Sequence, residues 1–212
     1  MQLIGQYDSP FVRRVAVALD LYGMAFEQMP WSVFGDADRL APINPLIRVP
    51  TLVMDDGVAF TDSAAILEVL DDMVGPERAL IARSGPDRRE ALRLMALAGG
   101  AADKAVSLVY EANLRETQLA SWVARCRSQV NGVFDALEAA RARRKGMWLF
   151  GDDISHADII LGTVTYFTGQ ALPDLFPLAN WPALKVHSDR CEASAPFKAH
   201  KQDFRLTLPA KT

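Results

Sequence analysis

The sequence predicts an α/β domain at its N-terminal end, followed by an all-helical domain. Residues 44–70 alternate short apolar runs with turn residues and end in apolar positions at helical spacing. Gly-Pro pairs then interrupt the pattern twice within residues 75–86, and everything beyond has helical spacing without an internal repeat. We therefore predict a first domain over residues 1–78, a linker over 79–86 and a helical domain over 87–212.

The first predicted elements are a buried strand at Leu3-Ile4 and a helix with Val12 and Leu19 on its apolar face. Ser9 and Pro10 stand at the helix start, where serine is a favoured cap and proline a favoured first residue. A hydroxyl at this position can also donate to a thiolate, while the helix dipole favours the negative charge. A free thiol has a pKa near ~8.5, so lowering it by one or two units would leave the thiol mostly ionised. Ser9 is thus either a simple cap or a group that activates a bound thiol.

A second strand is predicted within residues 25–29, and the mixed aromatic and charged residues 31–41 suggest an irregular loop or helix. Residues 50–54 and 58–60 then form an antiparallel hairpin through the Asp-Gly pair that ends at Gly57.

Candidate ligand-binding residues stand at both ends of this hairpin. Asp62 and Ser63 suit the start of a helix, whose free N–H groups favour a carboxylate, while the Asp62 side chain could meet an ammonium group. An amino-acid headgroup carries both charges. At the other end, Val49-Pro50 restricts Val49 to extended geometry, and a cis bond there would turn the Val49 backbone toward a ligand. The alternative is that these residues are caps and strand punctuation only.

The helical part contains two long apolar patterns and one predicted helix cap. Residues 92–106 carry several small side chains, which permit close helix packing, and residues 122–144 place Cys126 on an apolar face. Ser155 and Asp158 form a capping-box variant at the start of a further helix, so we assign them a folding role.

Three motifs resemble the glutathione S-transferases, and together with the capping-box motif they extend the resemblance over nearly the whole chain. Residues 48–52 and 61–66 are similar to the family's "VPxL" and "[DE]S.AI" motifs, and residues 9–15 resemble "SPFxxRV" of its serine-type classes, bacterial and tau-like. The resemblance implies the glutathione S-transferase fold, with a thioredoxin-like first domain. It also implies that Ser9 activates the glutathione sulfur. The predicted glutathione-binding residues are Ser9, Phe11, Arg48, Val49, Pro50, Asp62 and Ser63.

The three parts of glutathione are assigned through the same resemblance. Val49 would bond the cysteinyl backbone, and Asp62 with Ser63 would hold the γ-glutamyl group. Serine-type relatives often place a lysine near the glycyl carboxylate, but this chain has no lysine before Val49. Arg39 or Arg48 could replace it.

The resemblance implies that an electrophilic acceptor lies between the two domains. Aromatic residues are candidates for its apolar wall. We predict Tyr7, Phe11, Phe34, Tyr110 and Tyr166. Tyr7 is also a second hydroxyl near the start of the first helix, although its spacing fits the tyrosine-type classes less well.

Composition argues against several function classes, among them nucleic-acid-binding, membrane, exported and metal-binding proteins. A net charge of −3 gives no special attraction to nucleic acid or an anionic membrane, and no apolar stretch approaches ~18 residues. The chain opens on its first strand without a signal-like segment. The two cysteines are far apart in the sequence, which favours a reducing compartment. The three histidines are scattered, so neither residue type offers a metal cluster.

The expected protein is a cytoplasmic, homodimeric glutathione transferase that acts in detoxification. Its co-substrate is glutathione, its second substrate is a hydrophobic electrophile, and it needs neither a metal nor a tightly bound cofactor. Two alternatives stay open. One is a glutathione-dependent isomerase or dehalogenase, and the other is a non-catalytic binding protein that keeps the fold.

Overall fold

The computed structural model describes residues 1–207 and divides into two compact units. The first unit comprises Met1–Arg83 together with residues 195–207, and the second comprises Ser84–Ser194. The prediction had placed residues 195–207 in the helical domain. They belong to the first unit because the short helix α8 (Ala195–Ala199) packs on a helix of that unit, where the buried Arg13 donates to the Phe197 carbonyl at 2.9 Å.

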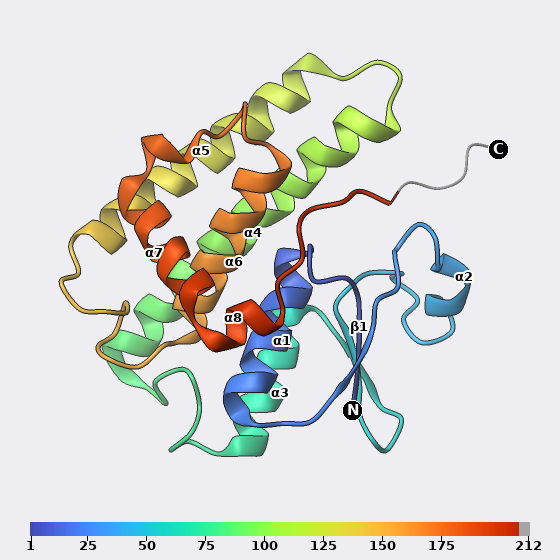
Figure 1. The fold of residues 1–212 in the computed structure, drawn as a ribbon. Helices are drawn as coiled ribbons and strands as arrows, with labels where there is room; N and C mark the ends of the chain where they lie inside the picture. The colour runs from blue at the N-terminus through green and yellow to red at the C-terminus, as the bar shows by residue number, and fades with distance from the viewer. Residues whose placement is uncertain (208–212) are drawn as a thin grey trace. The chain divides into compact units, whose positions relative to one another are not determined.

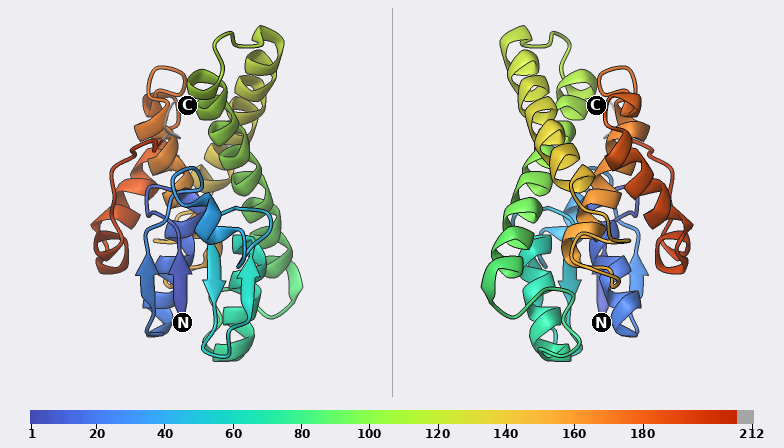
Figure 2. Two further views of the ribbon diagram at one scale, coloured as in Figure 1. Left: turned by 90° about the vertical axis from the view of Figure 1, so that its right-hand side faces the viewer. Right: turned by 90° about the vertical axis from the view of Figure 1, so that its left-hand side faces the viewer.

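The first unit contains a four-stranded mixed sheet in the order β2-β1-β3-β4. Its strands are β1 (Gln2–Ile4), β2 (Glu27–Met29), β3 (Thr51–Val53) and β4 (Ala59–Thr61), seen side by side in Figure 2. β1 and β2 are parallel, whereas β3 is antiparallel to both β1 and β4. This confirms the predicted thioredoxin-like α/β domain.

Helices α1 (Pro10–Tyr22) and α3 (Ser63–Val74) contact each other and lie on one face of this sheet, as Figure 1 shows. The short helix α2 (Ala37–Leu40) follows β2. The core forms where the apolar faces of α1, α3 and the strands meet, because these side chains alternate inward at strand or helical spacing. Its buried members are Leu3, Val12, Val15, Ala16, Ala18, Leu19, Tyr22, Leu52, Ile66, Leu67 and Leu70.

The second unit is helical, as predicted. Its elements are α4 (Gly85–Leu114), α5 (Ala120–Ala142), α6 (His156–Ala171), the 3-10 turn η1 (Leu178–Asn180) and α7 (Pro182–Ala193). α6 is buried along most of its length because α4 and α7 both pack against it. Within residues 1–207, no helix combines the length and the apolar character that crossing a membrane would require.

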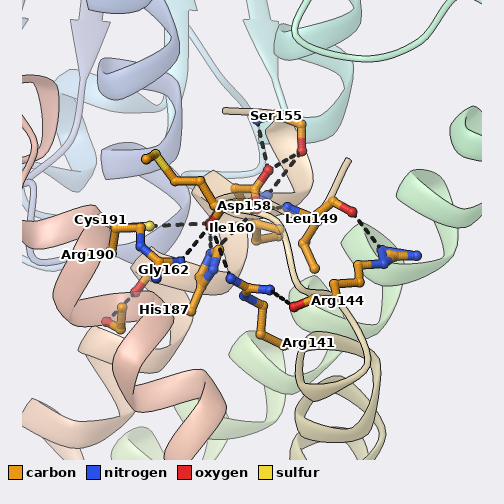
Figure 3. A network of polar contacts seen from close by, with 12 residues as sticks. Arg141, Arg144, Leu149, Ser155, Asp158, Ile160, Gly162, His187, Arg190 and Cys191 are labelled. Atoms are coloured by element: carbon orange, nitrogen blue, oxygen red, sulfur yellow. Dashed lines mark hydrogen bonds and ion pairs between the residues drawn. The ribbon is translucent and has the colours of Figure 1, made fainter. Parts of the chain in front are cut away.

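The start of α6 is fixed by the predicted capping box, which the structure confirms. The fully buried Asp158 carboxylate accepts from the Ser155 N–H at 2.9 Å, the Ser155 hydroxyl at 2.6 Å and the Leu149 N–H at 2.8 Å (Figure 3). From α5, Arg141 donates to the carbonyls of Arg144, Gly146 and Met147, so the connection from α5 to α6 is held at both ends.

His187 on α7 completes this network. It is fully buried, and its Nε2 donates to the Asp158 carbonyl at 3.1 Å. Burial lowers the pKa of His187, the nearby Asp158 opposes the shift, and Arg141 and Arg190 add to it. A second proton would have to sit on Nδ1, which has no hydrogen-bond partner among residues 1–207.

Acidification should therefore weaken the helical unit. Because the folded pKa of His187 lies below the unfolded value of ~6.5, the unfolded state binds more protons as pH falls, and stability drops by at most about 1.4 kcal/mol per pH unit. Urea denaturation between pH 7.5 and 5 should show a steeper loss for wild type than for His187→Gln. Equal pH dependence in the two proteins would contradict this assignment.

Candidate functional site

The strand register brings the predicted site residues to one edge of the sheet. Ile4 pairs with Thr51, and Thr51 pairs with Thr61, so these three residues form one row across β1, β3 and β4. The segment after Ile4, the segment before Thr51 and the segment after Thr61 therefore all leave the sheet at this edge. These segments carry Ser9, Val49 and Asp62 respectively.

Ser9 is the N-cap of α1, as predicted. Its Oγ accepts from the Val12 N–H at 3.4 Å, and the hydroxyl hydrogen can still be donated to a ligand. The side chain is half-buried, and α1 carries no acidic residue in its first turn. The positive end of the helix dipole is therefore not offset by an acidic side chain within that turn.

The segment before β3 is held by Asn44, a residue that is not among the predicted site residues. The Asn44 side chain is buried, and its Nδ2 lies 2.9 Å from Arg48 O, 2.9 Å from Thr51 Oγ1 and 3.0 Å from Thr61 Oγ1. The Val49–Pro50 peptide that follows is cis. A polar residue that precedes a strand and is followed by proline was the available sequence signal, but its three acceptors lie 4 to 17 residues away.

Asp62 caps α3 from a backbone conformation that non-glycine residues rarely adopt. Its φ is +67°, and its Oδ1 accepts from the Ala64 N–H at 2.8 Å. Aspartate tolerates positive φ better than most residues, and such strain is common at ligand sites. The carboxylate is exposed, whereas Ser63 beside it is buried.

A buried cation, Arg14, lies behind Asp62. It is 3 % exposed, burial lowers its pKa to about 10, and the Asp62 charge opposes that shift. Arg14 therefore stays charged at neutral pH. Arg14 belongs to the "SPFxxRV" motif, from which no role for it is predicted.

The two arginine candidates for the glycyl carboxylate differ in their surroundings. Arg39 lies 3.2 Å from Asp36 and stacks 4.3 Å from the centre of the Trp31 ring, so its guanidinium is engaged within its own loop. Arg48 is exposed and directly precedes Val49 at the site edge. Phe11 and Phe34 are half-buried, in α1 and in the loop before α2.

Tyr7 contacts the C-terminal segment of the first unit. Its ring packs edge-on against His200 at 5.0 Å between ring centres, and His200 Nε2 lies 3.6 Å from Asp20 in the last turns of α1. Burial and the Asp20 charge raise the pKa of Tyr7. The Tyr7 ring thus packs beside the C-terminal segment, and its roles as a wall residue and as a second hydroxyl stay predictions.

The last two wall candidates lie in the second unit. Tyr110 is in α4 and Tyr166 in α6, and both are half-buried. Within residues 1–207, no group of three or more His, Cys, Asp or Glu side chains is arranged to hold a metal ion.

The edge of the first unit combines features suited to a zwitterionic ligand with a thiol. The N-termini of α1 and α3 offer positive dipoles and backbone donors, Asp62 offers a carboxylate, and Ser9 offers a hydroxyl donor. Such a set can bind an α-amino acid headgroup and stabilise a thiolate at separate points.

Two sequence-family models match the chain. "Glutathione S-transferase, N-terminal domain" matches residues 3–78, and "Glutathione S-transferase, C-terminal domain" matches residues 120–190. Both matches agree with the two units described above.

Individual relatives support the same placement. The uncharacterized GST-like protein YibF of Escherichia coli is 33 % identical over 140 residues, which cover 65 % of this chain and 68 % of that protein. A maleylacetoacetate isomerase of Pseudomonas aeruginosa is 27 % identical over 212 residues, covering 93 % of this chain and 94 % of that protein. A solved glutathione S-transferase of Methylobacterium radiotolerans, in complex with glutathione sulfonate, has a TM-score of 0.90 at 28 % identity over 100 % of this chain and 98 % of that chain.

Proposed function

Because this chain belongs to the glutathione S-transferase superfamily, we propose that it binds glutathione at the sheet edge of its first unit and ionises the glutathione thiol for attack on an electrophile. The observation that carries the proposal is the position of Ser9 at the start of α1. Its hydroxyl can donate to the sulfur while the helix dipole favours the thiolate. The solved relative with glutathione sulfonate supports a glutathione-shaped site in this fold.

The rest of glutathione is assigned to neighbouring groups. The exposed Asp62 carboxylate would pair with the γ-glutamyl ammonium, and the free N–H groups at the start of α3 with its carboxylate. Val49 would bond the cysteinyl backbone, with Phe11, Pro50 and Ser63 beside the ligand. Arg48 would meet the glycyl carboxylate, because its side chain is exposed and it directly precedes Val49 at the sheet edge.

In the transfer step, the thiolate sulfur forms a bond to an electrophilic carbon. The bonding electrons of that carbon pass to a leaving group, or to a conjugated acceptor that then takes a proton. We propose a hydrophobic electrophile with Phe11, Phe34, Tyr110 and Tyr166 as wall residues, and a cytoplasmic homodimer that acts in detoxification. The chemistry of the thiolate requires no metal or prosthetic group.

A second candidate is a glutathione-dependent isomerase, which the likeness to maleylacetoacetate isomerase over nearly the full chain favours. The same thiolate would add to a conjugated double bond, the resulting single bond would rotate, and the sulfur would leave with glutathione regenerated. Both candidates share the Ser9 step and differ in whether the S–C bond persists.

The decisive experiment titrates the thiolate absorbance of bound glutathione against pH in wild type, Ser9→Ala and Ser9→Thr. The pKa of the bound thiol should lie one or more units below ~8.5 in wild type and in Ser9→Thr, which keeps the hydroxyl. Ser9→Ala should still bind glutathione, with a thiol pKa near the free value and kcat/KM lowered about 10- to 100-fold.

Two results would overturn the proposal. If glutathione does not bind wild type, the fold serves another purpose and the non-catalytic binding protein becomes the better description. If glutathione binds wild type with an unshifted thiol, Ser9 is only a helix cap. Loss of the cap hydrogen bond itself costs about 1 kcal/mol, so circular dichroism should confirm that Ser9→Ala is folded.

The Asp62 assignment predicts a selective loss of affinity. Asp62→Asn keeps an oxygen for the Ala64 N–H and tolerates the positive φ, but it removes the charge. The dissociation constant for glutathione should rise about 10- to 100-fold with little change in stability, as expected for a lost charge-assisted hydrogen bond. The matched control is Asp72→Asn, an exposed aspartate near the other end of α3. Calorimetric affinities equal to wild type in Asp62→Asn would refute the assignment.

A further inference from the structure

The segment after α8 runs back along the first unit to the start of α1. In Figure 1 it leaves α8 and passes the N-terminal end of α1. Its origin is anchored by Arg13, which donates to the Phe197 carbonyl at 2.9 Å and stacks 5.4 Å from the centre of the Phe197 ring. His200 then packs between Tyr7 and Phe26.

Beyond His200, the segment is bonded to the loop that carries Ser9. The Tyr7 N–H donates to Gln202 Oε1 at 2.9 Å, and the Arg205 N–H donates to Asp8 Oδ2 at 3.1 Å. These bonds connect residues 195 and 197 positions apart, and they engage the two residues directly before Ser9.

The burial pattern shows which face of the segment meets the loop. Gln202, Phe204 and Leu206 are half-buried, whereas the residues that alternate with them are exposed. This period of two is that of an extended chain with one face covered.

Asp8, which directly precedes Ser9, is the residue that the segment bonds. Burial raises the pKa of Asp8, and the backbone N–H groups of Arg205, Asp8 and Ser9 oppose that shift. The carboxylate therefore joins the segment to the residue directly before Ser9. A serine in a loop needs such fixation, because a misplacement of about 1 Å can cost a hundredfold in rate.

We infer that residues 200–207 form a strap that positions Ser9 for its contact with the glutathione sulfur, with Gln202 and Asp8 as the positioning residues. The inference rests on the proposed function. The Gln202 amide satisfies the Tyr7 N–H, and the strap backbone satisfies the Asp8 carboxylate. Together these two bonds limit the freedom of the turn between β1 and α1.

The test is a double-mutant cycle on the thiol pKa of bound glutathione. Gln202→Leu keeps the size of the side chain and removes the acceptor for Tyr7 N–H. In the wild-type background it should raise the thiol pKa by about 0.5 to 1 unit and lower kcat about three- to tenfold, with KM for glutathione less affected. In the Ser9→Ala background the same substitution should leave the thiol pKa unchanged, since it acts through Ser9.

A second pair of variants tests the strap independently, in case Gln202→Leu does not fold. Arg205→Pro removes the N–H that bonds Asp8, whereas Arg205→Ala retains it, so the proline variant should have the larger effect on the thiol pKa. The control is Lys198→Ala, an exposed residue of α8 outside the strap, which should match wild type.

Different results would overturn the strap and the activation of the thiol by Ser9. A shifted thiol in wild type that Gln202→Leu and Arg205→Pro leave unchanged would overturn the strap while Ser9 activation stands. An effect of Gln202→Leu that persists undiminished in the Ser9→Ala background would also overturn it. An unshifted thiol in wild type would overturn both the proposed function and the strap.

Discussion

Asp158→Ala is expected to lower the free energy of unfolding of the helical unit by about 3 to 5 kcal/mol. The carboxylate is fully buried and accepts three hydrogen bonds, from the Ser155 N–H and hydroxyl and from the Leu149 N–H. Alanine would leave these donors without their acceptor and would abolish the capping box at the start of α6. Because a domain is stable by only about 5 to 15 kcal/mol, this is a large share of the total.

The packing around α6 explains why the cost should be so high. α4 and α7 both pack on α6, and His187 of α7 bonds the Asp158 carbonyl. Fraying of the first turn of α6 would therefore disturb its contacts with α7 as well as its own cap.

Thermal denaturation followed by circular dichroism measures the effect. The midpoint should fall by about 10 °C, at roughly 2 to 4 °C per kcal/mol for a chain of this size. Asp153→Ala is the matched control, since Asp153 is an exposed carboxylate two residues before the Ser155 cap. A loss below about 1 kcal/mol in Asp158→Ala would show that the network is not a major source of stability.

The starts of α1, α3 and α6 could be predicted from the sequence because the interactions that determine them are local. Ser9 caps α1 through Val12, Asp62 caps α3 through Ala64, and Ser155 caps α6 through Asp158, each within three residues. Cap chemistry and apolar spacing act over one helical turn, so they can be read without a fold.

Contacts between residues far apart in the sequence could not be predicted from such local patterns. Tyr7 packs against His200, 193 residues later, a contact that no local pattern predicts. The assignment of residues 195–207 to the first unit likewise depends on Arg13 and Asp8, which no local pattern pairs with the C-terminal segment. The candidate glutathione residues share one sheet edge through a strand register that the hairpin turn fixes only for β3 and β4.

Asn44→Ala is the second variant with a large expected effect, and it links the fold to the site. We expect it to lower the free energy of unfolding by about 2 to 4 kcal/mol, because a buried amide that serves three acceptors would be lost. The same amide ties the Arg48 carbonyl to Thr51 and Thr61, so its loss also frees the segment that carries Val49. Glutathione affinity should therefore fall about tenfold even where the protein remains folded.

Urea denaturation and calorimetric titration with glutathione, run on the same preparations, separate the two effects. Leu46→Ala is the control, because Leu46 is 63 % exposed, lies in the same loop and keeps the N–H that Asn44 Oδ1 accepts. If Asn44→Ala loses stability but binds glutathione like Leu46→Ala, the Val49 segment does not depend on Asn44, and the cysteinyl assignment loses its structural support. If both stability and affinity fall together, and affinity falls further than in Leu46→Ala, one buried amide holds the sheet edge and orients the ligand backbone.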